Sequence, residues 1–174
     1  MGIQFETDYN METLTAMAKS LRKTVRRKRS RRVHIFAAVV LVLGILTILA
    51  TVAGGEPLGA SGVVTMLAML VVILVSLFED KLNAWFARKR LLPGTEHAVA
   101  TFEEDGYVSA TGVTESRFSY AQIVAVAETT RYFVFALSSH HTQAYDKRNI
   151  RGGSVEDFRA FIAEKTGKPI ANIK

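Results

Sequence analysis

Residues 33–53, VHIFAAVVLVLGILTILATVA, decide the architecture of this chain and contain no Asp, Glu, Lys or Arg. A helix rises about 1.5 Å per residue, so about 20 such residues cross the roughly 30 Å hydrocarbon core of a bilayer. A second stretch, residues 58–78 (LGASGVVTMLAMLVVILVSLF), is equally free of charge, and a turn with Gly and Pro separates the two. The sequence therefore predicts a transmembrane hairpin with helices at about 33–53 and 58–78.

A basic segment followed by an apolar one is also the pattern of a secretory signal, and Thr51-Val52-Ala53 resembles a cleavage site. Signal cores usually span about 7–15 apolar residues. The run here is longer, the basic region before it is long, and a second span follows. We therefore expect the first apolar run to stay in the chain as a membrane span.

The distribution of basic residues predicts which way the hairpin lies in the membrane. The basic residues before the first span are Arg22, Lys23, Arg26, Arg27, Lys28, Arg29, Arg31 and Arg32. Lys81, Arg88, Lys89 and Arg90 follow the second span, whereas the only charged residue in the loop between the spans is Glu56. The positive-inside rule then predicts that both termini are cytoplasmic, with Trp85 and Phe86 as anchors at the inner interface.

The two spans are expected to pack against each other through small side chains, because apolar burial gains little free energy in lipid. Ala37, Gly44 and Thr51 form one such stripe, and Thr65, Ala68 and Ser76 form the other. Small residues are also common in membrane helices without any packing role. No acidic residue lies in either span, so we do not expect an ion pathway through the hairpin.

The chain divides into three parts on this pattern. Residues 1–32 predict a strand (Ile3–Thr7) and then a basic amphipathic helix, which Thr7 or Asp8 is expected to cap. Residues 33–92 hold the hairpin and a juxtamembrane helix extension, which ends at Leu-Leu-Pro-Gly. Residues 95–174 predict a cytoplasmic β-rich domain with a terminal helix, and the first strand could add an edge strand to it.

Within residues 95–174 the apolar pattern changes to a period of two, which is typical of strands. The predicted strands are HAVATF, YVSAT, ESRFSY, IVAVAE, YFVFAL and TQAY. Ser154 and Asp157 then form a variant of the capping box at the start of a helix that Gly167 and Pro169 end. The expected fold class is α+β: the membrane hairpin plus a small antiparallel sheet or barrel of the pleckstrin-homology type, closed by the C-terminal helix.

Several short motifs recur in order through this part of the chain: Phe102, Asp105-Gly106-Tyr107, Ser119-Tyr120, Ile123, Glu128-Thr129, Tyr132-Phe133, Ala144-Tyr145-Asp146-Lys147-Arg148 and Glu156-Asp157-Phe158-Arg159. Through these residues the chain resembles the YcxB-like family of bacterial membrane proteins. The resemblance implies the bacterial cytoplasmic membrane, two spans and a pleckstrin-homology-like domain, but no known reaction. Asp146 departs from the proline that related sequences usually carry there, and it is expected to neutralise part of the Lys147-Arg148 charge.

The residues offer little for catalysis or metal binding. The 174 residues include no cysteine, which excludes disulfides, thiolate nucleophiles and Cys-based zinc sites. His140 and His141 would point to opposite faces of a strand, and Ser138 and Ser139 beside them do not form a triad. No glycine-rich phosphate loop or HExxH motif occurs. We expect no catalytic residue, no metal and no cofactor.

The net charge of +6 is concentrated in the basic run Arg22–Arg32, and such runs are attracted to anionic lipid. Together with Lys147, Arg148 and Arg151, this run is the predicted contact surface for anionic inner-leaflet lipid or for a protein partner, which includes a second copy of the chain. The same charges also serve to set membrane orientation. Nucleic acid is not expected as a partner, because the basic run lies against the membrane.

The preferred interpretation is a non-enzymatic membrane-anchored interaction or sensory protein. Two alternatives in another class are an accessory subunit of a membrane transporter and an immunity protein against a membrane-active peptide. A third is a lipid-modifying enzyme that depends on His140 or His141. The sequence does not decide between them.

Overall fold

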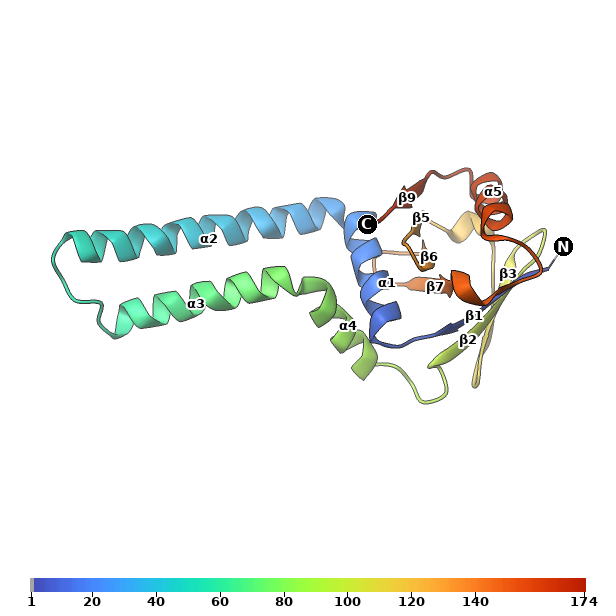
Figure 1. Ribbon diagram of the computed structural model, residues 1–174, viewed down its shortest axis with the longest axis horizontal. Coiled ribbons are helices and arrows are strands. Elements are labelled where there is room, and N and C mark those ends of the chain that lie inside the picture. Colours follow the sequence, from blue (N-terminus) through green and yellow to red (C-terminus); the bar gives the residue numbers. More distant parts are fainter. Residues whose placement is uncertain (1) are drawn as a thin grey trace.

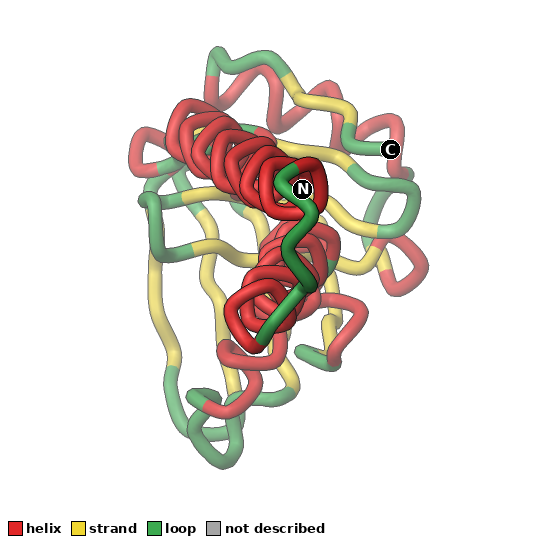
Figure 2. Tube along the Cα trace, turned by 90° about the vertical axis from the view of Figure 1, so that its left-hand side faces the viewer, coloured by secondary structure: helices red, strands yellow, loops and turns green. Residues whose placement is uncertain are grey.

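The computed structural model describes residues 2–174 as a helical hairpin that projects from a mixed α/β domain (Figure 1). Both chain ends lie on the domain side, away from the turn of the hairpin. Viewed along the hairpin, the two helices stand in front of the sheets (Figure 2). The predicted α+β class with a two-helix hairpin and a C-terminal helix is confirmed.

The hairpin consists of α2 (Arg27–Ala53) and α3 (Ala60–Leu77), and both are long and apolar enough to span a membrane. Their large apolar side chains are exposed along the whole length, which a soluble protein avoids. Helix α2 ends where the sequence predicts but begins six residues earlier than Val33, so that Arg27 to Arg32 form its first turns. The basic run Arg22–Arg32 is therefore helical except for a turn at residues 24–26, and its second part continues directly into the apolar helix.

Two further helices lie at the base of the hairpin and pack side by side: α1 (Met11–Lys23) and α4 (Glu79–Lys89). In Figure 1, α1 runs across the end of the hairpin, between it and the domain. Asn10 caps α1, because its Oδ1 accepts from the backbone N–H groups of Glu12 and Thr13 at 2.9 and 3.0 Å. The predicted caps Thr7 and Asp8 are wrong, because both residues still belong to the preceding strand.

The strands form two sheets. The first has the order β4-β3-β2-β1-β8 and the second the order β7-β6-β5-β9. The first contains β1 (Ile3–Asp8), β2 (His97–Phe102), β3 (Tyr107–Thr111), β4 (Glu115–Phe118) and β8 (Ile150–Arg151). The second contains β5 (Ala125–Glu128), β6 (Tyr132–Ala136), β7 (Thr142–Asp146) and β9 (Ile170–Asn172). Among residues 2–174 the hydrogen-bonded ladders stay within each sheet, so the strands do not close into a barrel.

The first strand has a different place from the one expected at a sheet edge. It pairs with β2 over its whole length, from Ile3↔Phe102 to Asp8↔His97, and with β8 on its other side. Everything from α1 to α4 is therefore an insertion between two neighbouring strands. Both ends of the membrane hairpin are tied, through α1 and α4, to the same corner of one sheet.

An aromatic core fills the space between the sheets, and α5 (Val155–Thr166) covers one side of it. Phe5, Phe102 and Phe158 are fully buried there, with ring centroids 4.6 to 5.8 Å apart. The predicted capping box is confirmed, because Ser154 and Asp157 bond each other's backbone N–H groups. After Gly167, the chain forms β9, which pairs in parallel with β5. The sequence pattern did not predict β9.

Candidate juxtamembrane binding site

A groove of about 580 Å³ lies where the hairpin meets the domain. We call it the junction groove. It is lined by Leu14, Met17, Ala18, Leu21, Arg22, Arg26, Arg29, Ser30, Val33, Glu79, Asn83, Phe86, Ala87, Arg90, His140 and Thr142. These residues come from α1, the start of α2, α4 and the β6–β7 turn. Four of its five charged residues are arginines. Its apolar side chains, here called the apolar floor, are Leu14, Met17, Ala18, Leu21, Val33, Phe86 and Ala87.

Arg22 is not a free cation in this groove, because it joins α1 to α4. Its Nε and Nη2 donate to the two carboxylate oxygens of Asp80 at 2.7 and 2.6 Å, and Glu79 lies 3.8 Å away. The bond to Asp80 raises the pKa of Arg22. This fork-shaped pair holds the basic helix against the helix that leaves the second span.

The remaining arginines of the groove lie along the break between α1 and α2 and at the end of α4. Arg26 Nε donates to the backbone oxygen of Ser139 at 2.6 Å, which ties the helix break to the tip of the β6–β7 hairpin. Arg29 and Arg90 line the groove with exposed side chains. They are the cations best placed to meet an anion that enters it.

The other members of the predicted basic surface lie outside the groove lining. Lys23, Arg27, Lys28, Arg31 and Arg32 are exposed on the first turns of α2 and the end of α1. Their charge adds to the field around the groove without forming its wall.

Trp85 and Phe86, the predicted interface anchors, are both about half exposed on α4. Their rings meet edge to face at 5.0 Å, and Lys89 Nζ lies 3.7 Å from the Trp85 ring centroid. Phe86 also lines the junction groove. An exposed aromatic pair beside a lysine is the composition found where helices cross the membrane–water interface.

The structure separates Lys147 from its predicted companions. Lys147 Nζ lies inside the domain, 2.9 Å from Glu128 Oε1 and 2.7 Å from the backbone oxygen of Thr129. Arg159 donates to the same carboxylate twice, at 2.8 Å each. These hydrogen bonds lower the pKa of Glu128, and the largest contribution comes from Arg159. Lys147 is thus committed to an internal ion cluster and does not face an outside ligand.

Arg148 and Arg151 are exposed, but the residues that line the junction groove do not include them. Arg151 pairs with Glu6 at 3.1 Å and Arg148 with Asp146 at 3.2 Å. Both arginines are thus paired with carboxylates outside the junction groove.

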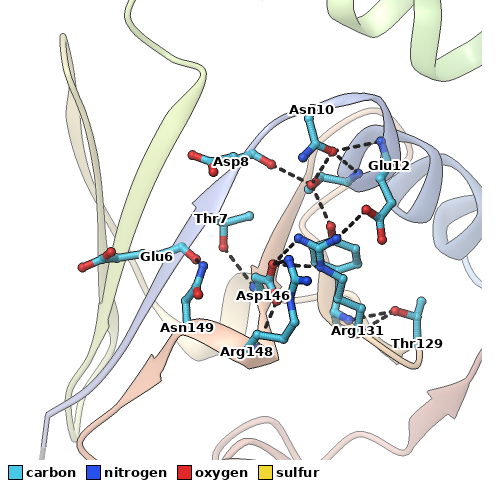
Figure 3. Close-up of polar contacts among 12 residues, drawn as sticks. Glu6, Thr7, Asp8, Asn10, Glu12, Thr129, Arg131, Asp146, Arg148 and Asn149 are labelled. Atoms are coloured by element: carbon cyan, nitrogen blue, oxygen red, sulfur yellow. Dashed lines mark hydrogen bonds and ion pairs between the residues drawn. The ribbon is translucent and has the colours of Figure 1, made fainter.

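Asp146 is buried, and its carboxylate accepts several hydrogen bonds (Figure 3). Its Oδ2 accepts from Arg131 Nε and Nη2 at 2.9 and 2.8 Å, and its Oδ1 accepts from the Arg148 backbone N–H at 3.0 Å. Arg131 also pairs with Glu12 of α1. Asp146 therefore neutralises Arg148, as expected, while Lys147 is neutralised by Glu128 instead.

The residues expected to pack the hairpin are mostly at the helix–helix contact. Ala37, Gly44 and Thr51 of α2 and Thr65 and Ser76 of α3 are partly buried, whereas Ala68 is exposed. A Cβ added at Gly44 would lie 2.6 Å from Met69 Sδ and 3.6 Å from Thr65 Cγ2. Met69, which the sequence pattern did not single out, occupies the place expected for Ala68.

His140 and His141 lie on an exposed turn between β6 and β7, and His140 Nδ1 is 2.7 Å from Ser139 Oγ. Residues 2–174 contain no group of three or more His, Cys, Asp or Glu side chains placed to hold a metal ion. The sequence analysis missed Asp80 and Glu79, although acidic residues directly after a membrane span were a visible signal. Their partner Arg22 lies 58 positions earlier, and no local pattern reveals such a pair.

The comparisons with known proteins agree with this description. The family model described as YcxB-like protein matches residues 102–162, which run from the end of β2 into α5. No curated protein and no solved structure matches the chain. The matched segment contains Glu128, Lys147 and Arg159, so residues that carry the resemblance build the internal ion cluster. The resemblance seen in the sequence is confirmed over residues 102–162, which match the YcxB-like family.

Proposed function

We propose that this chain is a non-enzymatic protein of the bacterial cytoplasmic membrane whose junction groove binds the anionic headgroup of an inner-leaflet phospholipid. The observation that carries the proposal is the composition of the groove: Arg26, Arg29 and Arg90 surround an apolar floor at the base of two apolar helices. A phospholipid presents the matching pair of features, an anion beside hydrocarbon.

The depth of the groove supports a headgroup rather than a soluble anion. Arg29 precedes Val33, the start of the predicted span, by four residues, or about 6 Å of helix. The headgroup layer outside the hydrocarbon core is roughly 5–8 Å thick on each side. This distance supports a position of the Arg29 guanidinium at the level of the lipid phosphates.

The chemistry of the side chains supports a phosphate. Arginine presents a planar fork of N–H donors that matches two phosphate oxygens, and it stays charged in a partly dry site. Each cation near an anionic leaflet contributes about 1 kcal/mol. Because Arg22 is neutralised by Asp80, the binding energy is assigned to Arg26, Arg29 and Arg90.

The topology in this proposal places both termini, and hence the β-rich domain, in the cytoplasm. The excess of Lys and Arg at the base of the hairpin supports this orientation. A reporter fused after Lys174 should show activity in the cytoplasm. Activity outside the cytoplasm would overturn the orientation.

We also interpret the domain as pleckstrin-homology-like. The strands β1 to β4 pair in sequence order, β5 to β7 form a second antiparallel set, and α5 covers the core. This order supports a binding module rather than an enzyme.

The lipid test uses the full chain in nanodiscs that contain phosphatidylcholine and a minor share of phosphatidylglycerol, followed by native mass spectrometry of retained lipid. The variant Arg29→Gln/Arg90→Gln removes two groove cations. At about 1 kcal/mol each, retained phosphatidylglycerol should fall about 30-fold. The matched control Arg31→Gln/Arg32→Gln removes the same charge outside the groove.

The outcomes separate a site from a general charge effect. Loss in the groove variant alone supports the proposal. An equal loss in both variants would show that the basic run attracts lipid only as a diffuse charge. No loss in either would show that these arginines set membrane orientation and bind no headgroup.

A further inference from the structure

A second cavity, of about 390 Å³, opens between the two sheets on the side that faces α1 and α4. We call it the inter-sheet cleft and define it by the polar residues Tyr9, Ser109, Thr111, Ser116, His141 and Gln143. It lies between strands of both sheets, next to the aromatic core. Neither the family match nor the proposed lipid site assigns it a role.

The cleft exists because side-chain size falls along the inner face of the first sheet. Tyr107 and Phe118 are cross-strand partners with rings stacked at 5.1 Å. The next pair on the same face is Ser109 opposite Ser116. Two aromatic rings fill the interior at one level, and two hydroxyls leave it open at the next.

Gln143 on β7 forms the inner wall of the cleft and is only 6% exposed. Its Oε1 accepts from the hydroxyls of Tyr107 and Tyr145 at 2.8 and 2.7 Å. Among residues 2–174 its side-chain nitrogen has no hydrogen-bond partner. Among the described residues, the buried side-chain atom without a partner is Ser20 Oγ. The Gln143 nitrogen is therefore not sealed in the core, and it can donate to an acceptor that enters the cleft.

Among the described residues, the ionisable side chains of the lining are Tyr9, His140 and His141. No Asp, Glu, Lys or Arg of the described chain is part of it. The Tyr9 hydroxyl stays neutral, because burial raises its pKa to about 12. An ion that entered would lose its hydration without a counter-charge, which is costly. Hydroxyls and the free amide instead offer both donors and acceptors to a neutral molecule.

Ring and apolar surfaces complete the site. The Phe118 and His141 rings meet edge to face with centroids 6.2 Å apart, and Leu14, Met17 and Leu91 lie on the side toward the hairpin. A ligand with C–H faces and several hydroxyls fits such walls. The volume lies at the small end of the range for small-molecule sites, about 300–1,000 Å³.

We propose that the inter-sheet cleft binds an uncharged polyhydroxyl group, a sugar ring or a cyclic polyol. The Gln143 amide donates to one ligand oxygen, and Ser109 and Ser116 bond neighbouring hydroxyls. This site does not depend on the anionic-lipid proposal. The group can come from a free sugar or from a glycolipid headgroup, since the cleft shares Leu14, Met17 and His140 with the junction groove.

The test uses the full chain in phosphatidylcholine nanodiscs, so that no anionic lipid is present. Saturation-transfer NMR measures the binding of glucose, inositol and glucose 6-phosphate, and a second set of nanodiscs contains glucosyl-diacylglycerol. The variant Ser109→Val/Ser116→Val removes both hydroxyls and narrows the cleft while keeping residues suited to strands. Thr101→Val, which removes a hydroxyl from the opposite face of β2, is the control.

Glucose or inositol should bind at least tenfold more tightly than glucose 6-phosphate, and the double valine variant should lose this binding while Thr101→Val keeps it. Binding of the free sugar or polyol identifies a soluble source, and binding of glucosyl-diacylglycerol alone identifies a headgroup. The proposal is overturned if no neutral probe binds in either format, if the phosphorylated sugar binds as well as glucose, or if the double valine variant binds normally.

Discussion

Glu128 and Arg159 are joined by two parallel hydrogen bonds of 2.8 Å, from Nε to Oε2 and from Nη2 to Oε1. Glu128 ends β5 and Arg159 lies on α5, so this pair fixes the helix against the second sheet. Lys147 brings a second cation to the same carboxylate from the segment after β7. All three residues lie within the part of the chain that matches the YcxB-like family. Their charges hold the domain together rather than face a ligand.

Replacing Arg159 with Met should therefore destabilise the domain. Glu128 is 7% exposed and would keep Lys147 as its only cation. Losing charge-assisted hydrogen bonds to a buried carboxylate costs about 2 kcal/mol. Hydrogen exchange of β5 and α5 amides in nanodiscs, together with a thermal melt, measures the loss. Arg117→Met at an exposed position serves as the control and should change stability by less than about 0.5 kcal/mol.

The same carboxylate predicts how stability depends on pH. Arg159 and Lys147 lower the pKa of Glu128 in the folded protein below its ordinary value of about 4.3. Its stabilisation is therefore complete above that ordinary value and is lost as the pH falls through the lower folded pKa. The variant Glu128→Gln should be less stable at pH 7 and should show a flatter decline between pH 5 and pH 2. A decline as steep as that of the wild type would assign the acid sensitivity to other carboxylates.

The hairpin and the alternating strands could be predicted from the sequence because their signals are local. A long run of uncharged apolar residues indicates a membrane span, and apolar residues at every second position indicate a half-buried strand. The place of β1 could not be predicted, because its partner β2 lies beyond the whole hairpin, at a separation of about ninety residues. Strand β9 was missed for the same reason. Its three residues are a strand only because they pair with β5, which lies far away in the sequence.

The candidate site shows the same division. The basic run and the aromatic pair on α4 are visible as composition, so their residues could be named. Which cations remain available could not be predicted, because Asp80 neutralises Arg22 and Glu128 neutralises Lys147 over long sequence distances. Arg90 and the apolar floor became part of the site only through the packing of α1 against α4.

Replacing Asp80 with Asn should loosen α1 from α4. The Arg22 and Asp80 side chains are 26% and 16% exposed, and their fork-shaped pair is the main polar link between the two helices. A partly exposed pair of this kind contributes about 1 kcal/mol, which corresponds to roughly fivefold faster amide exchange. Hydrogen exchange of α1 in nanodiscs measures this change. Lys81→Gln, at the next position of α4, should leave α1 unchanged, and equal exchange in both variants would remove Asp80 from this role.

The close approach of α2 and α3 at Gly44 predicts how the hairpin responds to bulk. A Cβ there meets the flexible end of Met69, so Gly44→Ala needs only a small movement of that side chain, whereas Gly44→Leu forces the helices apart. The chain has no cysteine, so spin labels at Val52→Cys and Val63→Cys report the separation specifically. Gly44→Leu should lengthen this distance on the order of 2 Å, and Met69→Ala in the same chain should restore it. Ala68→Leu, at an exposed position of α3, should change nothing; a lengthening there instead of at Gly44 would place the helix contact on the other face of α3.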